Sequence, residues 1–118
     1  MNLLEEIKTL GVDVDEGKER LMGNVSLYER MLIKFADMVK STAVQPDFDR
    51  SDFADVTEKV HSLKGAAGNL SIVPLYEAYA EIVDLLRDNQ PEQAKAVLEK
   101  IMPVQAQIVG CIERHREQ

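Results

Sequence analysis

The sequence contains no tryptophan, only three phenylalanines and three tyrosines, and a single cysteine, Cys111. A lone cysteine cannot form an intrachain disulfide, so nothing in the sequence calls for an oxidising compartment. With so few aromatic residues, a core has to be built from Leu, Ile, Val, Met and Ala, which mostly pack helix on helix. The N-terminus lacks the basic start and apolar run of a signal peptide. No stretch approaches the roughly 18 apolar residues of a membrane span. We therefore expect a cytoplasmic protein without membrane contact.

Positive charge is also scarce, with 14 Lys and Arg against 21 Asp and Glu and a formal net charge of −7. This balance argues against a nucleic-acid surface, which needs clustered basic residues. The sequence has no phosphate-binding glycine loop and no Gly-x-Ser-x-Gly elbow, so we expect neither an ATP site nor an enzymatic activity of its own. The length of 118 residues suits one domain, and we predict that residues 1–118 form it.

Apolar spacing and helix-breaking residues divide the chain into helices. The predicted helices cover residues 3–10, 13–22, 26–41, 52–70, 74–87 and 91–112. We expect Asp13 or Asp15 to cap the second helix and Asp49 or Ser51 to cap the fourth. Pro103 lies inside the last helix and should kink it or split it in two. Four main helices with short connections predict an all-α fold, an antiparallel four-helix bundle with one or two short N-terminal helices.

The helix predicted over residues 52–70 has an apolar face and, away from it, a face that carries a histidine. Its apolar residues are spaced 3, 4, 3, 4, 3 and form a stripe that should face the core, as Phe53, Val56, Val60, Leu63, Ala67 and Leu70. At about 100° per residue, His61 lies well away from this stripe. The residues expected beside it on the outer face are Thr57, Lys64, Gly65 and Gly68.

Two glycines in the middle of this helix need an explanation, because each costs about 1 kcal/mol relative to alanine. What Gly65 and Gly68 supply is clearance, which lets another molecule approach the backbone beside the imidazole. An exposed imidazole is a nucleophile at neutral pH. Lys64, one turn along, can balance the charge of a phosphoryl group on that ring. The pattern predicts a site built for access by a partner.

The string Val60-His61-Ser62-Leu63-Lys64-Gly65-Ala66-Ala67-Gly68-Asn69-Leu70 resembles the phosphorylation motif of histidine phosphotransfer (HPt) domains of bacterial multistep phosphorelays. Residues 11–17 and 26–32 also resemble the opening of HPt domains found on hybrid sensor kinases. The similarity spans about residues 10–100 and is loose beyond Ser71. One departure is Ser71-Ile72, where the family commonly has Gly followed by Ala.

The resemblance implies that His61 is the phosphoacceptor, which exchanges a phosphoryl group with an aspartate on a receiver domain. Lys64 is then the neighbouring cation, and Gly65 and Gly68 are the small positions that admit the partner. From the helical spacing alone, we expect Thr57 to belong to the same partner-access face. The implied partners are response-regulator receiver domains and a hybrid sensor kinase, with Mg²⁺ supplied by the receiver and no cofactor on this chain. We expect a monomer.

Two other functions stay open at this point. One is an HPt-like helical scaffold whose histidine is not used. The other is the N-terminal histidine domain of a chemotaxis-type kinase, phosphorylated by its own ATP-binding domain, although residues 10–35 look less like that family.

A separate pair of possible metal ligands lies near the C-terminus. Cys111 and His115 are four residues apart, a spacing at which two helical side chains can chelate a metal. Two ligands without a third nearby are too few, so we predict no metal site.

Overall fold

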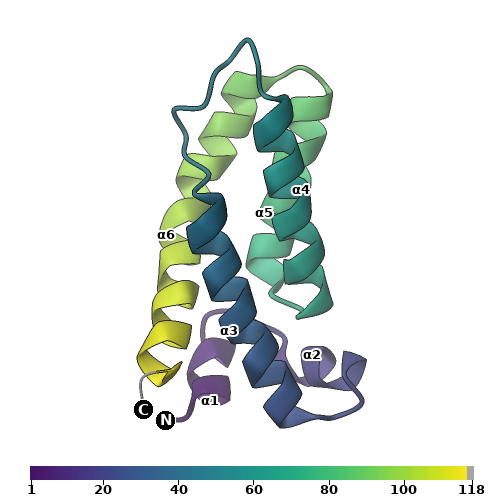
Figure 1. The fold of residues 1–118 in the computed structure, drawn as a ribbon, viewed down its shortest axis with the longest axis vertical. Coiled ribbons are helices and arrows are strands. Elements are labelled where there is room, and N and C mark those ends of the chain that lie inside the picture. The colour runs from purple at the N-terminus through teal and green to yellow at the C-terminus, as the bar shows by residue number, and fades with distance from the viewer. Residues whose placement is uncertain (117–118) are drawn as a thin grey trace.

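The computed structural model describes residues 1–116, and these residues form six helices (Figure 1). The helices are α1 (Leu3–Lys8), α2 (Val14–Arg20), α3 (Val25–Thr42), α4 (Ala54–Asn69), α5 (Val73–Arg87) and α6 (Pro91–Arg116). Each predicted helix is present, with ends that differ from the prediction by a few residues. None of these six helices has the length and apolar content that crossing a membrane requires.

The four long helices run alternately up and down, and neighbours in the chain pack side by side (Figure 1). α3, the first of the four, also packs on α6, the last, so each long helix contacts two others. The short helices α1 and α2 lie at the end of the bundle where α4 ends and α5 begins, and the segment 43–53 crosses the opposite end. The predicted antiparallel four-helix bundle with short N-terminal helices is confirmed.

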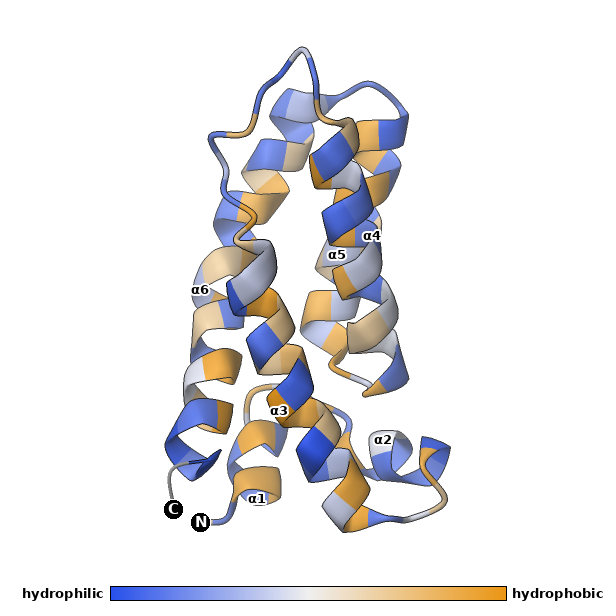
Figure 2. Ribbon diagram, viewed as in Figure 1, coloured by the Kyte–Doolittle hydropathy of each residue, from blue (hydrophilic) through white to orange (hydrophobic). Residues whose placement is uncertain are grey.

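Most core residues are aliphatic, as the scarcity of aromatic residues predicts, but four of the six aromatic side chains are also buried there, namely Tyr28, Phe35, Phe48 and Tyr79. Every bundle helix carries hydrophobic residues on one side and hydrophilic residues on another (Figure 2). The apolar pattern of the predicted helices places Phe53, Val60, Leu63, Leu75, Ile82 and Leu98 in the core, and all of these except Phe53 are buried. Phe53 is only half-buried, and so is Val56, which belongs to the same predicted apolar stripe. Phe53 precedes the first turn of α4 and lines a hollow at that end of the bundle.

The N-terminal caps expected for α2 and α4 can be compared with the structure. Asp13 caps α2, because its side chain accepts a hydrogen bond from the Glu16 amide at 3.1 Å. Neither Asp49 nor Ser51 caps α4, since that helix begins only at Ala54; the Asp49 carboxylate instead accepts from the Ser51 amide and hydroxyl at 2.8 and 2.7 Å.

Of the two outcomes expected at Pro103, a kink or a split, the split does not occur, because α6 continues through this residue. Proline has a φ value that fits a helix, and its cost is a missing N–H donor. Pro103 lies on the exposed side of α6, where water can satisfy the carbonyl one turn earlier.

The helix α2 supports the C-terminal end of α4 through a close contact at Gly17. A Cβ atom added to Gly17 would lie 2.5 Å from Cε1 of Tyr28 and 2.7 Å from the carbonyl oxygen of Leu70. The Tyr28 hydroxyl donates a hydrogen bond to that same Leu70 oxygen at 2.8 Å. Only a glycine lets α2 come this close, so α2 and α3 together fix where α4 ends.

The backbone conformation at the end of α4 shows why the family that the sequence resembles commonly has glycine at the position of Ser71. Ser71 has a φ of +55°, a left-handed conformation that glycine adopts without strain. The Ser71 amide donates to the Gly68 carbonyl at 3.2 Å and the Ile72 amide to the Ala67 carbonyl at 2.9 Å, which is the Schellman pattern of a helix end. The Ser71 hydroxyl compensates in part, because it donates to Oε1 of Glu16 on α2 at 2.9 Å.

We therefore expect Ser71→Ala to be less stable than Ser71→Gly by about 1–2 kcal/mol, the cost of a side chain in the left-handed region. Both variants lose the hydroxyl bond to Glu16, so the difference between them isolates the backbone strain. Urea unfolding of the two variants measures it. Equal stabilities would show that the positive φ at Ser71 carries no cost.

Candidate functional site

The outward face of α4 carries the residues singled out in the sequence. His61 and Gly65 are exposed, while Lys64 and Gly68 are half-buried. The core side of the same helix carries the buried Val60, Leu63 and Ala67, which hold α4 against its neighbours. The apolar stripe thus turns the imidazole of His61 away from the core, at the middle of a rigid helix.

Thr57 is one turn before His61 and is half-buried. Its hydroxyl donates to the carbonyl oxygen of Phe53 at 2.7 Å, a bond within the first turn of α4. This hydroxyl is therefore already engaged with the backbone, and what Thr57 offers to a partner is mainly a small side chain.

The two glycines have different surroundings. Apart from its chain neighbours and the backbone of α4 itself, a Cβ atom at Gly65 would meet no heavy atom of residues 1–116 within 4 Å, so open space lies above this position. A Cβ atom at Gly68 would lie 3.0 Å from Cδ1 and Cε1 of Tyr76 on α5. Gly65 thus leaves α4 accessible from outside, whereas Gly68 also makes room for an aromatic ring of the neighbouring helix.

A hollow next to His61 opens between α4, α5 and α2. Its lining residues are Glu16, Arg20, Lys64, Gly65, Gly68, Asn69, Ser71, Val73 and Tyr76. The side chain of Tyr76 is 41% exposed, and Val73 is also among the large exposed hydrophobic residues. The hollow, one turn along α4 from His61, therefore combines apolar surface with the cation of Lys64 and with an ion pair between Arg20 and Glu16 at 3.2 Å.

Sequence reasoning missed the α2 and α5 residues of this hollow. Tyr76 could have been noticed, because it lies off the apolar stripe of Leu75, Tyr79, Ile82 and Leu86 on its helix. Arg20 and Glu16 gave no such signal, since nothing in the sequence places α2 against the end of α4. Hydrogen bonds from Ser71 and Arg20 hold Glu16 there and keep the pKa of its carboxyl below the usual value.

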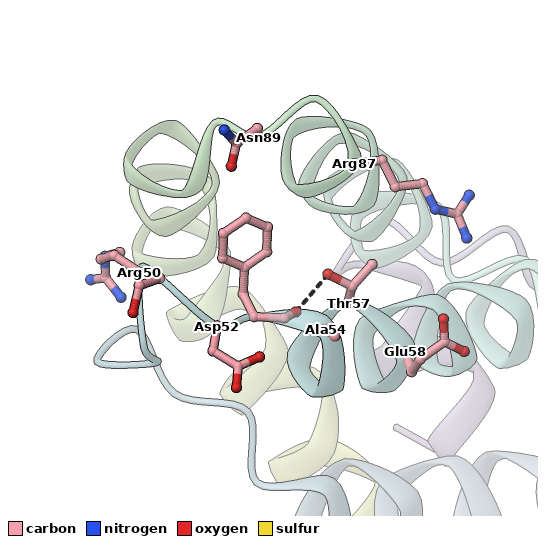
Figure 3. A pocket seen from close by; sticks show the side chains of 9 residues that line it. Arg50, Asp52, Ala54, Thr57, Glu58, Arg87 and Asn89 are labelled. Atoms are coloured by element: carbon pink, nitrogen blue, oxygen red, sulfur yellow. Dashed lines mark hydrogen bonds between the residues drawn. The ribbon is translucent and has the colours of Figure 1, made fainter.

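A second hollow lies at the N-terminal end of α4, where Arg50, Thr57, Glu58, Arg87 and Asn89 contribute to its walls (Figure 3). The Arg50 and Arg87 side chains extend away from each other (Figure 3). Arg50 is also occupied by Glu92 at 3.0 Å. The cations do not converge, so this hollow lacks the chemistry of an anion site.

The other histidine, His115, is in a different environment from His61. Its side chain is 14% exposed, and Nε2 lies 2.6 Å from Oε2 of Glu6 on α1. Arg114 pairs with the other oxygen of Glu6. The buried Cys111 stands one turn before His115, so α1 brings a third metal-ligand type to this pair. The premise that no third ligand stands nearby was therefore wrong.

Comparison with known proteins adds an independent finding. The family model described as Hpt domain matches residues 26–118, which is most of the chain and covers the four bundle helices except Val25, the first residue of α3. Residues 1–25, with α1 and α2, lie outside the match. No curated protein and no solved structure matched the sequence.

Proposed function

The chain belongs to the Hpt domain family, and from this premise we propose that it is a phosphocarrier of a two-component phosphorelay with His61 as the phosphorylated residue. The observation that carries the assignment to His61 is the contrast between the two histidines. His61 is exposed on the glycine-bearing face of α4, whereas His115 is mostly buried against Glu6. A receiver domain needs a histidine that its own active site can surround, and His61 meets that requirement.

In the proposed reaction, the ring nitrogen of His61 farther from the backbone, Nε2, attacks the phosphorus of an aspartyl phosphate on the receiver. The N–P bond forms as the P–O bond breaks, and the receiver aspartate leaves as a carboxylate. A second receiver later takes the group by the reverse exchange. Such transfer depends mainly on positioning and on charge stabilisation. The receiver supplies the Mg²⁺ and the carboxylate, and Lys64 places an ammonium group one turn from the phosphorylated ring.

We propose that the receiver docks over the hollow beside His61. Val73 and Tyr76 offer it apolar contact, and Lys64 offers positive charge close to where a phosphoryl group and acidic side chains of the receiver approach. Arg20 adds a guanidinium that Glu16 already pairs with and partly neutralises. The open space above Gly65 lets the receiver come close to the backbone of α4. In this arrangement α2, outside the family match, contributes Arg20 to the docking surface.

The access role of the glycines is testable at Gly65. We expect Gly65→Gln to leave stability level or raise it by up to about 1 kcal/mol, because glycine is the poorer helix former. Transfer from a receiver should slow about tenfold or more, since displacing a bulky side chain at a packed interface costs on the order of 1–3 kcal/mol. Phosphorylation by phosphoramidate, a small donor, should stay close to the original rate.

The matched control is Gly110→Gln on α6, where an added Cβ atom meets only the end of Arg114 at 3.8 Å. It should gain the same helix stability without slowing the receiver. Gly68→Gln is a less direct test, because the Tyr76 ring has to move as well. Receiver transfer that is as fast in Gly65→Gln as in the original chain would remove the access argument.

Incubation with a panel of phosphorylated receiver domains distinguishes the proposed function from its alternatives. A phosphocarrier takes label from at least one receiver and returns it to another. An unused HPt-like scaffold takes label from none of them. The N-terminal histidine domain of a chemotaxis-type kinase takes label from an ATP-bearing kinase domain. A hybrid sensor kinase as upstream partner and a cytoplasmic setting belong to the same proposal.

A further inference from the structure

Three side chains of different chemistry meet where α1 packs against the end of α6. They are Glu6 of α1 and Cys111 and His115 of α6, and one ligand atom from each lies within 4.8 Å of the others. Cys111 is fully buried, and His115 and Glu6 are half-buried. The cluster joins residues more than a hundred positions apart in the sequence, so it forms only in the folded chain.

The three ligand types are those that zinc prefers. Zn²⁺ binds thiolate sulfur, imidazole nitrogen and carboxylate oxygen, with distances of about 2.0–2.3 Å, and accepts three protein ligands with a fourth position for water. Ligand atoms around such an ion are roughly 3–4 Å apart, so the present separations need only small side-chain movements. The spacing of four residues places Cys111 and His115 on one face of α6.

Glu6 supplies the cluster with one negative charge, which its ion pair with Arg114 partly offsets. Hydrogen bonds from His115 and Arg114 keep the pKa of the Glu6 carboxyl below its usual value, so Glu6 is a carboxylate at neutral pH. Arg114 pairs with Oε1 of Glu6, while Oε2 is the oxygen that faces His115. Burial, with the nearby Glu6 charge, raises the pKa of the Cys111 thiol to about 11. The thiol is protonated without a metal, and zinc coordination releases that proton to water.

We propose that Glu6, Cys111 and His115 form a zinc site that fastens the N-terminal helix α1 to the C-terminal turn of α6. This site is separate from His61 and does not depend on the phosphotransfer proposed above. Zinc bound here stabilises the folded chain in proportion to its occupancy, because the unfolded chain has no such arrangement of ligands.

Cobalt is the most informative probe, because a Co²⁺–thiolate bond gives a charge-transfer band in the near ultraviolet and Cys111 is the only cysteine. We expect the reduced full chain to show this band with Co²⁺, and Zn²⁺ to remove it by competition. Mg²⁺ should leave it unchanged, since Mg²⁺ requires oxygen ligands. In Cys111→Ser the band should be absent, and in His115→Gln and Glu6→Gln the metal affinity should fall at least about 10- to 100-fold, as for loss of a supporting residue.

The control variant is His61→Gln, which removes the other imidazole and should keep both the band and the affinity. Circular dichroism without metal checks that each variant folds, and Glu6→Gln, at a half-buried position, is the one least expected to disturb the core. The proposal is overturned if the original chain shows no charge-transfer band, or if zinc binding is lost in His61→Gln and retained in His115→Gln. Either result would leave the cluster as a hydrogen-bond network alone.

Discussion

Replacing His61 with glutamine will abolish phosphoryl acceptance from a receiver and from phosphoramidate alike. Glutamine has no ring nitrogen that can attack phosphorus, and no other described side chain occupies the same place on α4. The fold will hardly change, because His61 is exposed and surface substitutions usually alter stability by only about ±0.5 kcal/mol. Labelling with a phosphorylated receiver, together with a melting curve, measures both effects.

His115→Gln is the matched control for this experiment, since it removes the only other histidine. It should leave phosphoryl acceptance intact and lower stability, because Glu6 loses a hydrogen-bond partner in the contact between α1 and α6. Labelling that persists in His61→Gln and disappears in His115→Gln would show that the assignment of the two histidines is the reverse of ours.

Replacing Gly17 with alanine will give one of the largest losses of stability available from adding a single methyl group to this chain. The new Cβ atom would lie 2.5 Å from the Tyr28 ring and 2.7 Å from the Leu70 carbonyl oxygen, and neither group can move freely because they are hydrogen-bonded to each other. Overpacking of this kind costs about 1–3 kcal/mol, more than the roughly 1 kcal/mol that alanine adds to helix stability. We expect a melting temperature several degrees lower.

Gly110→Ala is the control for this variant, because it makes the same change in a helix where space is available. It should raise stability by about 1 kcal/mol, the intrinsic preference of a helix for alanine. Since Gly17 contacts the end of α4 and not the middle, phosphorylation of Gly17→Ala by phosphoramidate should continue below its melting temperature. If Gly17→Ala were as stable as Gly110→Ala, the close approach of α2 to α4 would be refuted.

The bundle and the position of His61 could be predicted because both depend on local periodicity. The stripe that buries Val60 and Leu63 also determines which way His61 faces. The end of this stripe was predicted less well, since the burial of Phe53 depends on how the segment 43–53 covers the open end of the bundle. Pro103 shows the limit of a local rule, because the exposed side of α6 tolerates a proline that the sequence pattern treats as a break.

The hollow beside α4 and the cluster between α1 and α6 depend on contacts between distant parts of the chain, which periodicity does not encode. Tyr76 lies over Gly68 only because α5 returns along α4. Glu6 meets His115 only because α1 folds onto the far end of α6. Ser71 is intermediate: the resemblance to HPt domains identified the position as unusual, and the structure supplies the reason in its positive φ.

The most direct test of the central claim is to locate the phosphoryl group itself. The full chain is incubated with a phosphorylated receiver domain, separated from it, and examined by phosphorus and nitrogen nuclear magnetic resonance of the histidine side chains. Our account predicts one phosphoramidate, bonded to Nε2 of His61, with the ring of His115 unmodified. A phosphoryl group on His115, or a chain that none of the receivers in a broad panel can label, would contradict it.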